Sequence, residues 1–148
     1  MLTISIKYFN ELTLNELHDL LQLRSEVFVV EQDCVYQDID GKDRNALHIL
    51  GFKDGKLLAY SRAFKPGEYF NEAGIGRVVV KKEERSNDYG YVIMKASIQA
   101  VQEHFNAPKI RVAAQTYLKS FYNNLGFKEV GEMYEEDGIP HIQMIIDQ

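Results

Sequence analysis

A largely apolar run at 75–80 leads through a polar turn at 85–90 into a segment with apolar residues at helical spacing, from about 89 to 105. This pattern predicts a strand, a turn and a helix in direct succession. The first backbone N–H groups of a helix have no partner inside it, and the helix dipole places partial positive charge beside them. The turn is therefore a candidate site for a phosphate or pyrophosphate. Taken alone, an ordinary strand–turn–helix connection explains the segment equally well.

Two hairpins and two further helices complete the predicted pattern. Asp54-Gly55 and Asp137-Gly138 each lie between two strand-like runs, which is a strong signal for a tight hairpin. Thr13 and Glu16 form a capping box at a helix start. The predicted strands are 3–9, 47–52, 56–64, 75–80, 109–114, 127–134 and 139–146, and the predicted helices are 14–30, 89–105 and a short one with Thr116 as N-cap and a left-handed Gly126 at its end. This order predicts an α/β fold with a mixed sheet, in one domain over residues 1–148.

The composition of the chain limits which kinds of partner the protein can bind. The 148 residues carry a net charge of -5 and no basic tract, which excludes non-specific nucleic-acid binding because nothing would replace the phosphate counterions. No apolar run approaches the ~18 residues of a membrane span, and the first residues alternate like a strand instead of forming a signal peptide. Cys34 is the one cysteine, so no internal disulfide can form. We therefore expect a cytoplasmic protein with no membrane partner.

Two motifs resemble those of the GCN5-related N-acetyltransferases (GNAT). The turn Arg85-Ser86-Asn87-Asp88-Tyr89-Gly90 is similar to the family's phosphate loop, Arg/Gln-x-x-Gly-x-Gly/Ala, with Asp88 in place of the middle glycine. In a second marker of the family, the pair Phe121-Tyr122 falls on the family's Phe/Leu-Tyr pair, while Gln115 and Leu118 stand where the family often has Asn and Ala. Runs at 23–32, 36–41 and 135–142 are similar to its ElaA-like branch. The resemblance covers nearly the whole chain and implies the acyl-CoA N-acyltransferase (GNAT) fold, a mostly antiparallel sheet with splayed fourth and fifth strands that hold acetyl-CoA between them.

The resemblance implies a cofactor site in three parts. The turn and Arg85 would bind the pyrophosphate, the open edge of strand 75–80 would pair with the pantetheine amides, and Gln115 would hydrogen-bond the pantetheine arm. We expect Asp88 to be a helix N-cap that points away from the ligand, because a carboxylate repels a pyrophosphate. The expected acetyl-CoA-binding residues are Val78, Val80, Arg85, Ser86, Asn87, Asp88, Tyr89, Gly90, Tyr91 and Gln115.

Tyr122 is the predicted general acid. An unperturbed phenol has a pKa of about 10, so it is protonated at neutral pH and can donate to a departing thiolate. The alternative for Tyr122 is a core tyrosine on an amphipathic helix. Glu31 or His141 is the predicted general base, acting directly or through a water molecule. We expect the acceptor cavity to be lined by Arg24, Asp38, Arg62 and Arg77.

The resemblance implies an acetyltransferase in which an amine attacks acetyl-CoA directly, and we expect it to need no metal. Asp38-Ile39-Asp40-Gly41 resembles a calcium loop, but Tyr36 and Leu47 occupy its first and last ligand positions. The expected acceptor is a small-molecule amine or an exposed amino group, and homodimers are common in the family. Two alternatives stay open: a non-catalytic acyl-CoA-binding sensor with the same fold, and an interaction domain whose acidic loop docks a basic partner.

Overall fold

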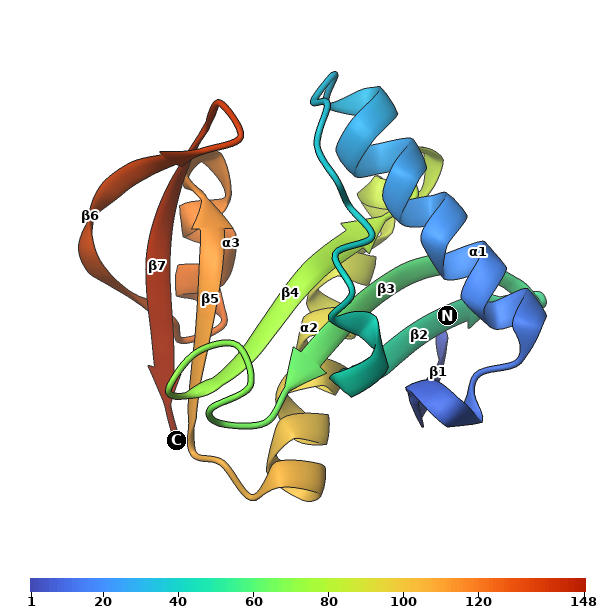
Figure 1. Cartoon of the computed structure of the whole chain (residues 1–148), viewed down its shortest axis with the longest axis horizontal. Helices are drawn as coiled ribbons and strands as arrows, with labels where there is room; N and C mark the ends of the chain where they lie inside the picture. The colour runs from blue at the N-terminus through green and yellow to red at the C-terminus, as the bar shows by residue number, and fades with distance from the viewer.

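The computed structural model describes all 148 residues and contains one seven-stranded sheet with helices on both faces (Figure 1). The strands are β1 (Thr3–Tyr8), β2 (Leu47–Lys53), β3 (Lys56–Phe64), β4 (Ala73–Val80), β5 (Lys109–Gln115), β6 (Lys128–Glu136) and β7 (Ile139–Asp147). Their order in the sheet is β1-β2-β3-β4-β5-β7-β6, and all neighbours are antiparallel except β4 and β5. The predicted mixed, mostly antiparallel sheet is confirmed.

The helices are α1 (Leu14–Arg24), α2 (Tyr89–Phe105) and α3 (Lys119–Asn124), with 3₁₀ turns η1 (Phe9–Glu11), η3 (Asp43–Asn45), η4 (Lys82–Asn87) and η5 (Thr116–Leu118). α1 runs straight into a π-helical segment, η2 (Ser25–Glu31), so the predicted helix over 14–30 has the right extent but changes type at Ser25. The prediction of Thr116 as an N-cap is wrong, because Thr116 opens η5 and Leu118 precedes α3.

α1 begins where the sequence predicts because its capping box forms. The Thr13 hydroxyl accepts a hydrogen bond from the Glu16 N–H at 3.0 Å, and the Glu16 carboxylate accepts one from the Thr13 N–H at 2.9 Å. The same carboxylate binds the Lys7 ammonium of β1 at 2.8 Å. The start of α1 is therefore tied both to its own backbone and to the edge of the sheet.

Apolar cores lie on both faces of the sheet. α1 packs Leu20 and Leu23 against Leu50, Tyr60 and Val79 on one face. The larger core, on the other face, is shared by α2 and the sheet. Figure 1 shows α1 in front of β3 and α2 behind it. Since helices cover both faces of the central strands, seven successive residues of β3 are buried.

Both predicted hairpins form. Asp54 and Gly55 have φ values of 53° and 76°, and Asp137 and Gly138 have the same pair of values. Positive φ at both central residues defines the turn type whose twist matches two antiparallel strands, which is why Asp-Gly is favoured there. Gly126 also has the positive φ predicted for it, 104°.

The sheet opens between β4 and β5. Their parallel pairing covers only Ala73 with Ile110 and Gly74 with Arg111. Beyond this point the two strands diverge, and Figure 1 shows the gap widening toward the end where the β6–β7 hairpin lies. A side chain at Gly74 would place its Cβ atom 2.9 Å from the Phe70 ring, so the close approach at the junction needs glycine. The predicted splay of the fourth and fifth strands is therefore confirmed.

Candidate active site

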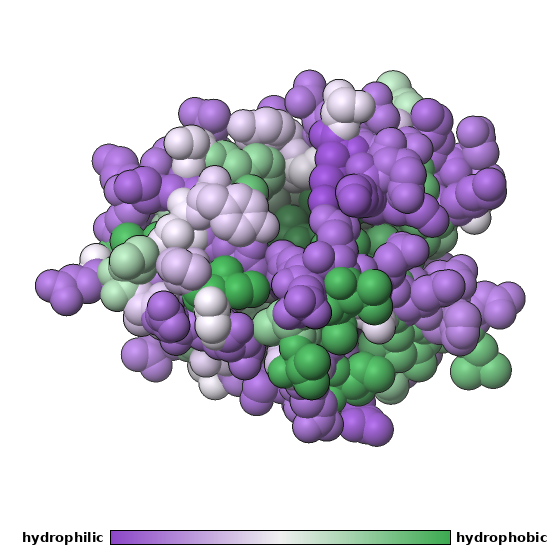
Figure 2. Space-filling model, turned by 90° about the horizontal axis from the view of Figure 1, so that it is seen from above, coloured by the Kyte–Doolittle hydropathy of each residue, from purple (hydrophilic) through white to green (hydrophobic).

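A cavity of about 540 Å³ fills the opening between the diverging strands. Residues 74–80 of β4 form one wall, and Ala113 and Gln115 of β5 contribute to the other. Seen from above (Figure 2), the surface is hollowed here, with apolar side chains deep inside and hydrophilic ones around the rim. The volume lies in the range of small-molecule sites, and the lining combines apolar walls with a few polar groups.

The turn between β4 and α2 lies at one end of this cavity. α2 leaves the N–H groups of its first three residues, 89 to 91, without helical acceptors, and the first helical bond runs from Val92 N–H to the Asp88 carbonyl at 3.2 Å. Gly90 lines the cavity, and a Cβ atom there would lie 3.3 Å from the Phe121 ring. The predicted arrangement of free N–H groups at a crowded, glycine-containing helix start is present.

Asp88 holds the N-cap position but does not act as the predicted side-chain cap. Its φ and ψ are 60° and 20°, in the left-handed region, and its side chain makes no capping hydrogen bond. The family pattern has glycine here, and aspartate enters the left-handed region more readily than most residues. Asp88 thus replaces the glycine in backbone conformation, and the prediction that its carboxylate caps the helix is wrong.

Of the other turn residues, only Arg85 and Gly90 line the cavity. The Tyr89 side chain is buried in the main core, so only its backbone can face a ligand. The Tyr91 ring packs against Phe121, and its hydroxyl accepts a hydrogen bond from Asn124 at 3.2 Å. Five residues expected to bind the cofactor therefore have no side chain in the cavity, and only their backbone groups could contact a ligand there. They are Ser86, Asn87, Asp88, Tyr89 and Tyr91.

Glu31 pairs with the turn instead of facing the reaction centre. Arg85 donates from Nε to the Val80 carbonyl at 3.1 Å and from Nη2 to the Glu31 carboxylate at 2.8 Å, with Nη1 binding the second carboxylate oxygen. These hydrogen bonds from Arg85 lower the pKa of the Glu31 carboxyl. A carboxylate with a lowered pKa is a weaker base, and Glu31 lies at the end of the cavity beside the turn before α2. Both facts argue against the predicted role of Glu31 as general base.

Residues 31–34, which we call the strap, contribute Glu31, Gln32 and Cys34 to the lining of the cavity. Besides the Glu31 contact, Gln32 and Gln115 exchange side-chain hydrogen bonds of 3.3 Å, and the Cys34 thiol lies 3.4 Å from the Asp137 carbonyl. The strap thereby contacts the turn before α2, the end of β5 and the tip of the β6–β7 hairpin. Glu31 and Gln32 of the strap thus bind Arg85 and Gln115, the two side chains that we expect to bind the cofactor.

Tyr122 lies on α3 and lines the cavity, although its side chain is almost fully buried. The ring packs edge-on between Phe121 and Phe127, with centroids 5.0 Å and 5.7 Å away. Burial, reinforced by the nearby Tyr117 phenol, raises the pKa of the Tyr122 hydroxyl. Tyr122 is therefore both the core residue of the alternative interpretation and a protonated donor at the cavity wall.

His141 also lines the cavity, from β7 opposite Gln115 of β5. Its Nδ1 lies 2.7 Å from the Ile139 carbonyl oxygen, which can only accept, so Nδ1 carries the proton. Nε2 is then left with a free lone pair, 3.8 Å from the nearest oxygen of Glu136. Of the two predicted bases, His141 has the geometry to accept a proton inside the cavity.

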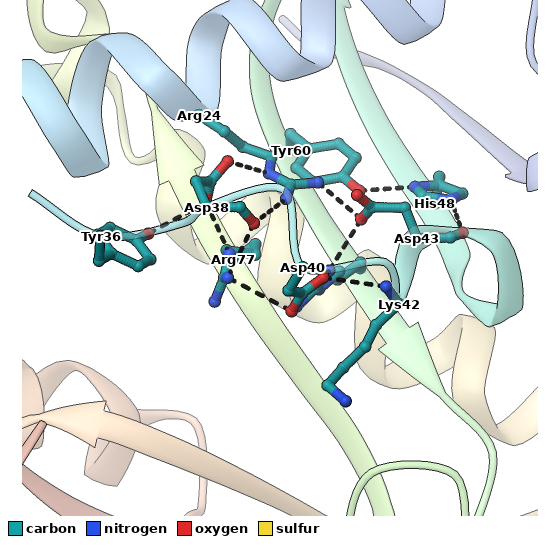
Figure 3. A network of polar contacts seen from close by, with 10 residues as sticks. Arg24, Tyr36, Asp38, Asp40, Lys42, Asp43, His48, Tyr60 and Arg77 are labelled. Carbon is teal, nitrogen blue, oxygen red and sulfur yellow. Dashed lines mark hydrogen bonds and ion pairs between the residues drawn. The ribbon is translucent and has the colours of Figure 1, made fainter. Parts of the chain in front are cut away.

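The loop after the strap is held by a buried ionic network (Figure 3). Arginines from α1, β3 and β4 meet three aspartates of this one loop; the members are Arg24, Arg62, Arg77, Asp38, Asp40 and Asp43. Three positive and three negative groups leave the network neutral. All three carboxylates are engaged by guanidinium groups, and no cluster of three or more His, Cys, Asp or Glu side chains is placed to hold a metal ion.

Arg24 is the hub of the network. It is fully buried and donates to the Asp38 carboxylate at 2.9 Å, to the Asp38 carbonyl at 2.9 Å and to the Asp43 carboxylate at 2.7 Å. Arg24 and Asp38 do not line the cavity, so the prediction that they do is wrong. Their positions 14 residues apart, on a helix and a loop, gave no local signal of the contact.

Arg62 fixes the middle of the loop to β3. It donates to Asp40 at 2.6 Å and 2.9 Å and to Asp43 at 2.8 Å. Burial alone would raise the pKa of the Asp40 carboxyl, but the hydrogen bonds from Arg62 outweigh it and lower that pKa. Sequence reasoning missed Asp40 and Asp43; the signal was an arginine inside a mostly apolar, buried strand, because such an arginine needs a buried counter-charge.

His48 and Tyr60 complete the network on the far side of Asp43. His48 Nε2 lies 2.9 Å from the Asp43 carbonyl and therefore donates to it, so Nδ1 accepts from the Tyr60 hydroxyl at 2.6 Å. Burial lowers the pKa of His48, which keeps the ring neutral. His48 is thus a structural residue of the loop anchor and does not face the cavity.

The comparisons with known proteins agree with this geometry. The family model of the acetyltransferase (GNAT) domain matches residues 12–148 of this chain. Protein ElaA of Escherichia coli is 43% identical over 139 residues, which is 93% of this chain and 91% of ElaA. The chain belongs to the GNAT family of acetyltransferases. Members of this family use an acyl-CoA as co-substrate.

Solved structures place this GNAT domain in the same branch. The crystal structure of Escherichia coli ElaA has a TM-score of 0.92 at 40% identity, covering 99% of this chain and 100% of that one. An acyl-CoA N-acyltransferase of Pseudomonas aeruginosa has the same TM-score and identity, covering 99% of both chains. A UPF0039 protein of Schizosaccharomyces pombe is 41% identical over 95% of this chain and 94% of its own. None of these names specifies an acceptor. No helix of this chain is long and apolar enough to span a bilayer.

Replacing Arg24 by methionine should destabilise the fold by about 3–5 kcal/mol, because Asp38 and Asp43 would remain buried without their main counter-charge. Arg111→Met is the matched control. Arg111 pairs with Glu72 in a partly exposed site, so its loss should cost less than about 1 kcal/mol. Urea unfolding of both variants measures the difference. Equal losses would show that burial of the network does not determine its contribution.

Replacing Glu31 by glutamine should tighten binding of coenzyme A about three- to fivefold. The change frees Arg85 for the pyrophosphate, and a partly exposed ion pair is worth at most about 1 kcal/mol. Glu26→Gln, on the same π-helical segment but exposed and without a partner, is the control and should leave the affinity unchanged. Isothermal titration calorimetry with coenzyme A compares the two. Weaker binding by Glu31→Gln would mean that the strap supports the turn instead of competing with the ligand.

Proposed function

We propose that this protein transfers the acetyl group of acetyl-CoA to the amino group of a small molecule or of an exposed residue. The observation that carries the proposal is the continuous cavity between β4 and β5. It runs from the free N–H groups at the start of α2 to Tyr122 and His141, so a ligand that binds phosphate at one end reaches a proton donor and a base.

The residues present fit an acyl-CoA. The N–H groups of residues 89–91 and the Arg85 guanidinium suit the pyrophosphate, which carries the negative charge that Glu31 supplies in the free protein. Val78 and Val80 belong to the β4 edge that β5 leaves unpaired, where backbone groups can bond the pantetheine amides. Gln115 offers a side-chain amide on the opposite wall.

Acetyl-CoA supplies an activated acyl group, and the chain's residues move the protons. Nε2 of His141 accepts the proton that the amine loses as its nitrogen bonds to the acyl carbon. Backbone N–H groups of β4 beside the cavity stabilise the carbonyl oxygen while the carbon–sulfur bond breaks. Tyr122 donates its hydroxyl proton to the sulfur of the leaving thiolate, and exchange with solvent restores the phenol. The acceptor is an amine that enters past the strap.

Acetyl-CoA should raise the stability of the protein. A ligand that binds only the native state at about 100 times its dissociation constant adds about 2.7 kcal/mol. Thermal unfolding with and without the ligand measures this. S-acetyl-N-acetylcysteamine, which carries the thioester but no pyrophosphate, is the control and should shift the midpoint little. An unchanged midpoint with millimolar acetyl-CoA would refute the proposed function.

Tyr122→Phe should lower turnover about 10²-fold while acetyl-CoA affinity stays the same, because the ring still packs and only the proton donor is lost. Tyr91→Phe, whose phenol bonds Asn124 outside the cavity, is the control and should keep full turnover. Release of the coenzyme A thiol is measured with an amine that the wild-type protein acetylates. Turnover within about twofold of wild type would exclude Tyr122 as general acid. Binding of acetyl-CoA without turnover on any amine would favour the sensor alternative.

A further inference from the structure

The strand that forms the cavity wall contains a bulge at Arg77. In the pairing of β3 with β4, Tyr60 faces Val79 and Arg62 faces Gly76, so the single residue Ser61 spans two residues of β4, Arg77 and Val78. A bulge of this kind leaves backbone groups of the longer strand unpaired and bends the strand. Both residues of the bulge, Arg77 and Val78, line the cavity, and β5 pairs with neither of them.

Arg77 has an unusual backbone conformation for its residue type. Its φ is 51°, and each other non-glycine residue with positive φ in this chain is an aspartate or asparagine. Such residues tolerate the left-handed region, whereas a long side chain rarely adopts it. The neighbouring Gly76 does not take the positive φ, although no atom lies within 4 Å of where its Cβ would be. The bulge is therefore held in place by something other than local preference.

The Arg77 side chain supplies that restraint. Its Nη2 donates to the Asp38 carbonyl at 3.1 Å and to the Asp40 carboxylate at 3.5 Å, and its Nε is ion-paired, without hydrogen-bond geometry, with an Asp38 carboxylate oxygen 2.8 Å away. The guanidinium also lies over the Tyr36 ring, 5.6 Å from its centroid. Asp38 is itself held in position, because Arg24 donates hydrogen bonds to its carboxylate and to its carbonyl.

We propose that Asp38 and Asp40 are positioning residues, which act through Arg77 to hold the β4 bulge in the conformation that presents its backbone N–H groups to the acyl carbonyl. This inference rests on the proposed function. It also changes the role of Arg77, which is a restraint on the strand and not a ligand of the acceptor. The loop that follows the strap thus controls the reaction centre through Arg77, whose guanidinium it holds at the wall of the cavity.

Two substitutions at the same position separate this role from direct contact. Arg77→Ala removes the guanidinium and leaves a residue that disfavours positive φ, so the bulge should relax. Arg77→Gly removes the same guanidinium but adopts positive φ readily, so the bulge should persist. The infrared carbonyl band of bound acetyl-CoA labelled with ¹³C at the acyl carbon reports the hydrogen bond without any acceptor. Affinity for coenzyme A, which has no acyl carbonyl, serves as the control for folding and for the rest of the site.

We expect the wild-type protein to lower the carbonyl frequency relative to free acetyl-CoA, Arg77→Gly to retain this shift and Arg77→Ala to lose it, with coenzyme A affinity within about twofold in all three. With an amine that the wild-type protein acetylates, kcat of Arg77→Ala should fall about 10²-fold with little change in KM for acetyl-CoA. Asp38→Asn should lose the shift in the wild-type background but cause no further change on Arg77→Gly. If the Asp38→Asn variant does not fold, the comparison of Arg77→Ala with Arg77→Gly is enough to test the inference.

Three results would overturn the inference: no carbonyl shift in the wild-type complex, equal retention of the shift by both Arg77 variants, or equal loss by both. Equal loss would mean that the guanidinium itself acts on the ligand. These results differ from failure of the proposed function. In that case either the wild-type protein does not bind acetyl-CoA, so that neither coenzyme A nor its acetyl thioester raises the unfolding temperature, or it binds acetyl-CoA but acetylates no amine.

Discussion

The whole site depends on how little pairing joins β4 to β5. Two residue pairs, Ala73 with Ile110 and Gly74 with Arg111, connect the two parts of the sheet. Beyond them the facing edges lose their sheet partners, and buried backbone groups without partners are costly. The fold accommodates this because β3 and β7 continue to bond the outer edges of the two strands, while the inner edges line a cavity. The break in the sheet and the ligand site are therefore one feature.

A strand supported on one edge needs restraint from elsewhere, and the ionic network supplies it. Arg24, Arg62 and Arg77 come from three different elements, but all their partners lie in one loop. Buried ion pairs are weak evidence of net stability, because desolvation offsets much of the attraction. Their directional hydrogen bonds do define positions, however. The network thus fixes the geometry of β4 right at the cavity, which Arg62 and Arg77 also line.

Local signals predicted the parts of the structure that local physics determines. The Asp-Gly hairpins, the capping box at Thr13 and the start of α2 after the turn follow from preferences of a few adjacent residues. The network and the strap could not be predicted this way, because their contacts join residues 14 to 103 positions apart. The same limit explains why Arg24 was assigned to the acceptor: a polar residue on a helix reveals its charge, but its partner is visible only in three dimensions.

The strap also bears on how the protein responds to ionic strength. Opening it breaks the Glu31–Arg85 pair, so the observed affinity for a phosphate-bearing ligand is the intrinsic affinity reduced by the fraction of molecules in which Arg85 is free. Salt screens the attraction between Arg85 and the ligand, and it screens the attraction between Arg85 and Glu31 as well. The two effects oppose each other. For the proposed pyrophosphate ligand, the affinity should therefore depend less on salt than it would at an exposed arginine without a carboxylate partner.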